Sequence, residues 1–205
     1  DGWFGNRNDD KTSLGDWSIN IAKIDLEEVI NYAHSKKMKF GLWVEPEMLS
    51  PDSNLYKEHP EYALYNRNVK PTLYRHQLVL DFTKNKIVDE VFDKIFSIFS
   101  KYDIDYCKWD FNRYLSEIGS TYLNKDQEGE IYHRFILGTY RLLDKFTKKF
   151  PNILLETCAS GGGRFDLGML YYSPQIWASD ETDPNARIEI QFATNLFYPL
   201  STIGA

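Results

Sequence analysis

The chain has 205 residues, with 24 Lys and Arg against 30 Asp and Glu, which gives a formal net charge of −6 at pH 7. A chain of this length forms one domain or two small ones. The aromatic content of 16% argues against intrinsic disorder, since disordered chains are poor in aromatics. The acidic balance without a Lys/Arg block argues against nucleic-acid binding, and no apolar run reaches the ~20 residues of a membrane helix.

The ends of the chain indicate a piece of a longer protein. The sequence starts at Asp1 without Met, inside what looks like a motif, and it stops at Ala205 directly after an apolar segment. We therefore expect residues 1–205 to be excised from a longer enzyme. Any signal peptide would then lie outside this piece, and a location inside the cell is favoured.

Helical and strand patterns alternate along the chain. A helix is predicted over 25–37, where Asp25 can cap the first turn and Leu26, Val29 and Ile30 fall on one face. The following elements are, in chain order, a strand over 39–44, a helix over 84–101, a strand over 104–109, a helix over 129–149, a strand over 153–158, a strand over 175–179 and a helix over 186–197.

This alternation predicts an α/β fold built from parallel βα units, because a parallel crossover needs a helix-length connection. A doubly wound sheet and a (β/α)8 barrel both fit the pattern. No strand is followed by a Gly-rich phosphate turn of the Rossmann type, and polar residues follow each strand in turn. Both details favour a TIM barrel, here partial, with about strands 3 to 6 and their helices. The whole chain, 1–205, would form the central part of a catalytic barrel.

The polar residues at the four strand ends indicate a sugar site. Carboxylates gather there, and three of the strands carry a Trp at or near the end, namely Trp43, Trp109 and Trp177. Sugar C–H faces stack on aromatic rings, and sugar hydroxyls bind charged side chains. Glycoside cleavage needs two carboxyl groups, one acting as nucleophile or base and one as general acid.

Asp110 is the best candidate for the nucleophile. Lys108 lies two residues before it, on the same side of the strand, where it could keep the carboxylate ionised and bind a substrate hydroxyl. Asp180 is the candidate acid/base, because the neighbouring Glu181 and Asp183 favour the protonated form that an acid catalyst needs. The alternatives are a turn-capping Asp110 paired with Lys108, and an acidic cluster at the start of a helix for Asp180.

The remaining polar motifs carry weaker predictions. Gly161-Gly162-Gly163 lacks the Lys-Ser/Thr of a phosphate loop and is interpreted as a tight turn that allows close backbone approach. Cys158 is interpreted as a buried thiol or a sugar contact, because no His lies in a nearby motif. Glu45 and Glu47, separated by Pro46, rank below Asp110 and Asp180 as a second acid pair. The four histidines show no ligand spacing, so neither a metal nor a cofactor is expected.

Five motifs in one order resemble the α-galactosidases of glycoside hydrolase family 36, the melibiase group. They are Asp1-Gly2-Trp3-Phe4-Gly5 with Asp9-Asp10, residues 41–48, residues 108–113, residues 158–166 and residues 177–183. The resemblance implies a (β/α)8 catalytic domain and retaining hydrolysis of terminal α-galactosides such as melibiose and raffinose. It places the nucleophile at Asp110 and the acid/base at Asp180. Sugar contacts are implied at Asp9, Asp10, Trp43, Arg75, Lys108, Cys158, Gly161 and Trp177.

The resemblance leaves other functions open. Raffinose and stachyose synthases, which transfer galactose, share the core motifs, and a galactoside-binding fragment without activity of its own is a further alternative. The expected partner is a small-molecule α-galactoside, with no nucleic acid and no membrane. Family members are often homo-oligomers with a large N-terminal β-domain, so we expect the full-length protein to be a homo-oligomer.

Overall fold

The computed structural model describes residues 1–204, and its centre is a five-stranded sheet. The strands are β1 (Gly41–Val44), β4 (Tyr106–Trp109), β5 (Leu154–Thr157), β6 (Gln175–Trp177) and β7 (Ile203–Gly204). They lie in the order β1-β4-β5-β6-β7, and every neighbouring pair is parallel. Strand order therefore follows chain order without a reversal. The predicted α/β class with parallel strands is confirmed.

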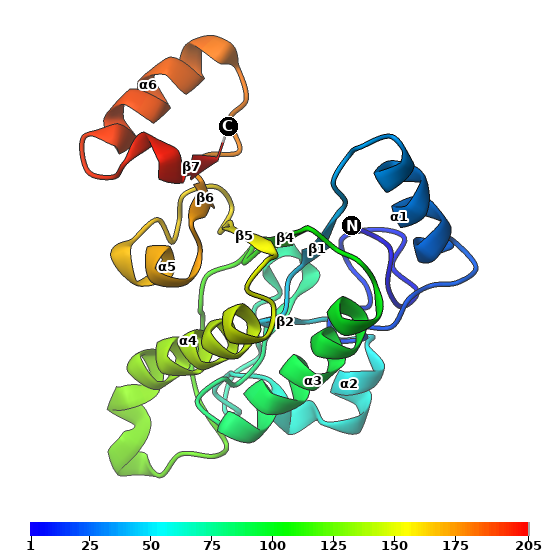
Figure 1. The fold of residues 1–205 in the computed structure, drawn as a ribbon. Helices are drawn as coiled ribbons and strands as arrows, with labels where there is room; N and C mark the ends of the chain where they lie inside the picture. Colours follow the sequence, from blue (N-terminus) through cyan, green and yellow to red (C-terminus); the bar gives the residue numbers. More distant parts are fainter. Residues whose placement is uncertain (205) are drawn as a thin grey trace.

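Six α-helices are found among the described residues. They are α1 (Leu26–Ser35), α2 (Asn54–Glu58), α3 (Asn85–Lys101), α4 (Ile131–Lys149), α5 (Leu167–Tyr172) and α6 (Pro184–Asn195). Asp25 caps α1 as predicted, because its side chain accepts the backbone N–H of Glu28 at 3.0 Å. The helices α3 and α4 lie side by side along one side of the sheet, and α6 lies beyond β7 (Figure 1).

The long segments after the strands contain structure that the sequence patterns did not predict. The segment 45–83 holds α2 and a small antiparallel pair, β2 (Met48–Leu49) with β3 (Leu78–Val79). The segment 159–174 holds α5. Short 3₁₀ turns occur at Pro60–Tyr62, Tyr74–His76, Lys125–Glu130 and Leu200–Thr202.

Side chains along β4 alternate between a buried face and a half-buried face of the sheet. Cys107 and Trp109 are fully buried, and the Trp109 ring meets Phe146 of α4 edge to face at 5.8 Å. Tyr106 and Lys108, on the opposite face, are only half-buried. The helices thus cover an apolar face, while the other face carries polar side chains. Within residues 1–204, no helix is both long and apolar enough to cross a bilayer.

Candidate active site

Asp110 follows the last residue of β4 and is held from several directions. Its backbone N–H donates to the Val44 carbonyl at 2.8 Å, which continues the pairing between β1 and β4. Its Oδ2 accepts the indole N–H of Trp43 at 3.1 Å, and its Oδ1 accepts the backbone N–H of Phe111 at 2.9 Å. Only 9% of the residue is exposed. These donors fix the direction in which a nearly buried carboxylate faces.

The Trp43 ring is fixed in turn by the N-terminal segment. Trp3 Nε1 donates to the Trp43 carbonyl at 2.9 Å, and the Arg7 guanidinium lies 5.5 Å from the centre of the Trp43 ring. Arg7 is buried and donates from Nε to Asp1 Oδ1 at 2.6 Å. Neither Asp1 nor Arg7 was predicted as a site residue. The only indication in the sequence was their position: Asp1 opens the motif Asp1-Gly2-Trp3-Phe4-Gly5, and Arg7 follows it.

Asp180 lies three residues beyond β6, at the same edge of the sheet as Asp110, because the two strands run parallel. Its Oδ1 accepts the indole N–H of Trp177 at 3.0 Å. The neighbouring acidic residues Glu181 and Asp183 have contacts different from those of Asp180. Asp183 caps α6 by accepting the backbone N–H of Asn185 at 2.9 Å, and Glu181 accepts the backbone N–H of Asp183 at 2.9 Å. The helix-capping alternative therefore describes Asp183, and Asp180 is exposed beside a tryptophan.

The structure corrects the predicted partner of Lys108. Lys108 forms its ion pair with Glu156, which lies directly across from it in the β4–β5 register, and not with Asp110. Its Nζ also lies 4.6 Å from the centre of the Trp177 ring. Glu156 is buried, and its charge adds to the effect of burial in raising the pKa of Tyr106. Strand register, which the sequence does not reveal, brings these charges together.

The glycines after β5 pack against the end of β6, as the tight-turn interpretation predicted. A Cβ on Gly161, whose φ is +82°, would lie 2.9 Å from the Cα of Ser179. A Cβ on Gly162 would lie 2.6 Å from the Ala178 carbonyl oxygen. The glycines therefore allow this loop to lie directly against the residues that precede Asp180.

Cys158 begins the same loop and faces Asp110. Burial and the charge of Asp110 raise the pKa of its thiol to about 12, and the backbone N–H of Gly161 donates to its Sγ at 3.4 Å. The thiol therefore stays protonated at neutral pH. A neutral thiol in this place fits the predicted sugar contact and does not fit a nucleophile.

Asp9 and Asp10 lie close enough to Arg7 for their charges to act on it. Both are exposed, and they line a hollow of about 460 Å³ together with Asp1, Arg7 and Lys23. Asp9 accepts the backbone N–H of Lys11 at 2.9 Å, as in a local turn. Arg7 lines this hollow, and its guanidinium also lies over the Trp43 ring. Sugar contacts at Asp9 and Asp10 stay a prediction from the motifs.

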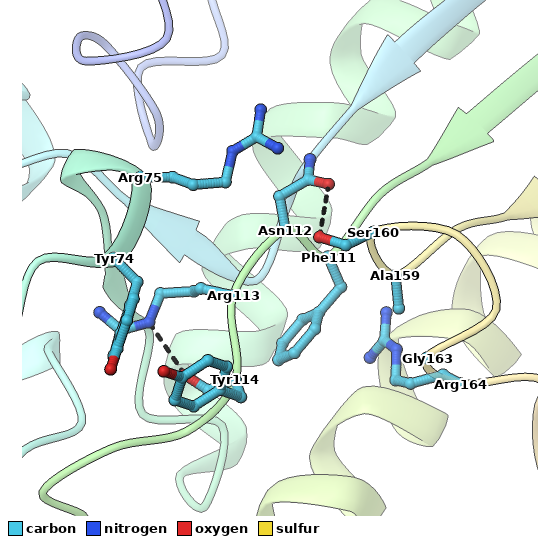
Figure 2. A pocket seen from close by; sticks show the side chains of 10 residues that line it. All are labelled: Tyr74, Arg75, Phe111, Asn112, Arg113, Tyr114, Ala159, Ser160, Gly163 and Arg164. Atoms are coloured by element: carbon cyan, nitrogen blue, oxygen red, sulfur yellow. Dashed lines mark hydrogen bonds between the residues drawn. The ribbon is translucent and has the colours of Figure 1, made fainter. Parts of the chain in front are cut away.

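Arg75 lines a second hollow, of about 390 Å³, that reaches the residues directly after Asp110. Figure 2 shows the Arg75 side chain extended toward Asn112, whose Oδ1 accepts the hydroxyl of Ser160 at 3.4 Å. Arg75 has a left-handed backbone with φ at +51° and is exposed. The rings of Tyr74 and Tyr114 pack at a tilt of 48° on another wall, with their centroids 4.3 Å apart. This placement puts Arg75 close to the residues that follow Asp110, and a sugar contact at Arg75 stays a prediction from the resemblance.

Comparison with known proteins decides the family. The family model described as Melibiase matches residues 1–205. The chain belongs to the melibiase family. It is 48% identical to Alpha-galactosidase 1 of Pediococcus pentosaceus over 207 residues, which is 100% of this chain and 28% of that protein. The resemblance noted from the motifs is thereby confirmed.

Solved melibiase-family structures share the fold of this chain. An α-galactosidase from Lactobacillus brevis superposes with a TM-score of 0.97 at 49% identity, covering 100% of this chain and 28% of that one. A doubly substituted variant of the GH36 α-galactosidase AgaA of Geobacillus stearothermophilus, solved with raffinose, gives a TM-score of 0.98 at 46% identity and covers 100% of this chain and 29% of that one. Another doubly substituted variant of AgaA has been solved with stachyose. This melibiase chain thus spans a little over a quarter of the length of these relatives.

Glu45 is a further ionisable group of this melibiase site, and the sequence ranked it low. It follows β1, is fully buried, and accepts the backbone N–H of Asn112 at 2.7 Å and Gln77 Nε2 at 3.2 Å. Burial and the negative charge of Asp110 raise its pKa from the usual 4.5 to about 7, against the opposing effect of the Asn112 N–H and of the positive charges of Arg7 and Arg75. The Glu45 carboxyl, close enough to Asp110 to sense its charge, therefore titrates near neutral pH.

Proposed function

We propose that the protein is a retaining α-galactosidase that releases terminal α-linked galactose from galactosides. One observation carries this proposal. Two carboxylates, Asp110 and Asp180, lie at the same edge of a parallel sheet, and each accepts a hydrogen bond from the indole of a tryptophan. Paired carboxylates bordered by aromatic rings suit glycoside cleavage. Membership of the melibiase family supports the choice of α-galactosides.

The two carboxylates would act in a double displacement. An oxygen of Asp110 attacks the anomeric carbon as the glycosidic C–O bond breaks, and Asp180 gives its proton to the leaving oxygen. The product of this step is a galactosyl ester on Asp110. Asp180, now a carboxylate, takes a proton from water, whose oxygen attacks the same carbon and releases Asp110. Two inversions give net retention, and we expect a carboxyl separation of about 5–5.5 Å.

Neighbouring side chains would bind the sugar. The Lys108 ammonium is paired with Glu156 and close to Trp177, and it would bind ring hydroxyls on the polar face of the sheet. Trp43 and Trp177 would offer ring faces to the sugar while their N–H groups hold the two carboxylates. Raffinose and stachyose, which AgaA binds, are the natural first substrates to test along with melibiose.

We also propose that the sheet is an arc of a (β/α)8 barrel. The five strands follow chain order, their connections carry helices, and the candidate site residues stand at the carboxyl edge. A doubly wound sheet would reverse its strand order at the binding crevice, and no such reversal occurs within residues 1–204. In a barrel, the carboxyl ends of the strands surround one mouth.

Replacement of Asp110 by Asn in the protein expressed from its complete reading frame tests this function. The parent should hydrolyse an aryl α-galactoside with retention, followed by NMR of the first-formed anomer. Asp110→Asn should lose nearly all turnover while still binding galactose. Asp126→Asn, at an exposed position in the 3₁₀ turn before α4, is the matched control and should match the parent. Normal turnover by Asp110→Asn, or inversion by the parent, would refute the proposal.

A further inference from the structure

Glu47 is a fully buried carboxylate whose oxygens are both occupied by protein donors. Arg164 Nη1 donates to Oε2 at 3.0 Å, and Arg164 Nη2 donates to Oε1 at 2.9 Å. Trp109 Nε1 donates to Oε1 at 3.2 Å, and Thr139 Oγ1 donates to Oε2 at 2.8 Å. A carboxylate offers about four acceptor sites, and here all four are used. Glu47 therefore has no lone pair left for substrate.

The four donors come from three separate parts of the chain, and two of these parts carry the candidate catalytic machinery. Trp109 is the last residue of β4 and directly precedes Asp110. Arg164 closes the loop that begins at Cys158. Thr139 lies in the middle of α4, on the covering layer of helices. Glu47 thus joins the strand end that bears the nucleophile to the loop that packs against the end of β6.

Arg164 also restrains the residue on the other side of Asp110. Its guanidinium carbon lies 4.1 Å from the centre of the Phe111 ring, and the Phe111 backbone N–H donates to Asp110 Oδ1. Figure 2 shows Arg164 and Phe111 on one wall of the hollow that continues from Asn112 and Ser160. Both chain neighbours of Asp110 are therefore restrained through Glu47. Trp109 donates to Glu47 directly, and Phe111 packs under Arg164, which is itself paired with Glu47.

We propose that Glu47 is a positioning residue, which fixes Asp110 and the Cys158–Arg164 loop relative to each other for the reaction. This inference rests on the proposed glycosidase function. A bidentate carboxylate–guanidinium pair is strongly directional. Gln at position 47 would keep the shape but supply one acceptor oxygen, and its amide N–H groups would face the Arg164 donors. The ion pair would be lost, with the side chain at position 47 still fully buried and that of Arg164 only 14% exposed.

The test measures steady-state hydrolysis of an aryl α-galactoside by the intact protein. A small displacement of a reacting group can cost on the order of 100-fold in rate, so Glu47→Gln should lower kcat by about that factor, with KM close to the parent value. Glu130→Gln is the matched control, since it removes a carboxylate paired with Arg134 at 2.7 Å on the exposed start of α4. It should retain the parent kcat.

A double variant separates positioning from stability. Removing both charges, in Glu47→Gln with Arg164→Met, avoids an unpaired buried arginine, so the melting temperature should recover relative to Glu47→Gln alone. The kcat should stay low, because the link between the strand end and the loop is still missing. Recovery of kcat together with melting temperature, or a normal kcat in Glu47→Gln, would overturn the inference. A parent without hydrolysis would instead overturn the proposed function.

Discussion

Glu45→Gln should change how the stability of the protein depends on pH. Glu45 is fully buried, and the charges that face it are those of Asp110, Arg7 and Arg75. Its pKa of about 7 in the folded protein compares with a usual value of 4.5. Well below pH 4.5 the group is protonated in both the folded and the unfolded state. Between pH 4.5 and 7 the folded protein holds the proton more tightly, so the free energy of unfolding decreases as pH rises.

The size of the effect follows from the two pKa values. A difference of about 2.5, at 1.36 kcal/mol for each pKa unit, is about 3 kcal/mol in total at high pH. Between pH 5.5 and pH 8 the expected loss is about 2 kcal/mol. Gln cannot ionise, so Glu45→Gln removes this loss. The altered hydrogen bonds to Asn112 and Gln77 add a difference that does not depend on pH.

Urea unfolding of parent and variant at pH 5.5 and pH 8 provides the measurement. The free energy of unfolding of Glu45→Gln minus that of the parent should be about 2 kcal/mol larger at pH 8 than at pH 5.5, because only the parent loses stability over this range. Glu27→Gln, at an exposed position on α1, is the control and should show no such change. An equal difference between Glu45→Gln and the parent at both pH values would refute a titrating Glu45.

Three further changes have distinct expected outcomes. Asp180→Asn should slow hydrolysis of melibiose far more than that of an aryl galactoside with an acidic leaving group, since only the former needs a proton; equal losses would contradict the acid role. Gly138→Ala would place a Cβ 2.0 Å from the Phe82 carbonyl oxygen, and it should lower the free energy of unfolding by about 1–3 kcal/mol, measured by thermal unfolding. Gly129→Ala is the control, since its Cβ would have no neighbour within 4 Å, and it should leave the free energy of unfolding unchanged. Lys108→Met leaves Glu156 buried without its ion pair, so both melting temperature and galactose affinity should fall; unchanged affinity would argue against Lys108 as a sugar contact.

The longer helices and strands were predictable because periodicity is local, whereas the short helices α2 and α5 were not. The stripe of apolar residues in 84–101 predicted α3, which runs from Asn85 to Lys101. The pair β2 and β3 was not predicted, since each strand has two residues and two residues show no alternation. The location of Asp110 and Asp180 at one edge of the sheet was predictable, because residues that follow parallel strands gather at that edge.

Interactions across the sheet were beyond the sequence patterns. The Lys108–Glu156 pair depends on the register between β4 and β5, and spacing along one strand led to the wrong partner. The Glu47–Arg164 pair joins residues 117 positions apart. Burial decides the character of Glu45 and Glu47, because the same sequence Glu45-Pro46-Glu47 would be an ordinary acidic turn if it were exposed.

Covalent trapping tests the assignment of the nucleophile most directly. The intact protein is treated with a fluorinated galactosyl fluoride, a substrate whose galactosyl ester on the enzyme forms quickly but is hydrolysed slowly. The labelled peptide is then sequenced by mass spectrometry. The expected result is a single galactosyl ester on Asp110, within the peptide that contains residues 108–113. A label on Glu45 or Asp180, or turnover of the galactosyl fluoride without any ester, would contradict it.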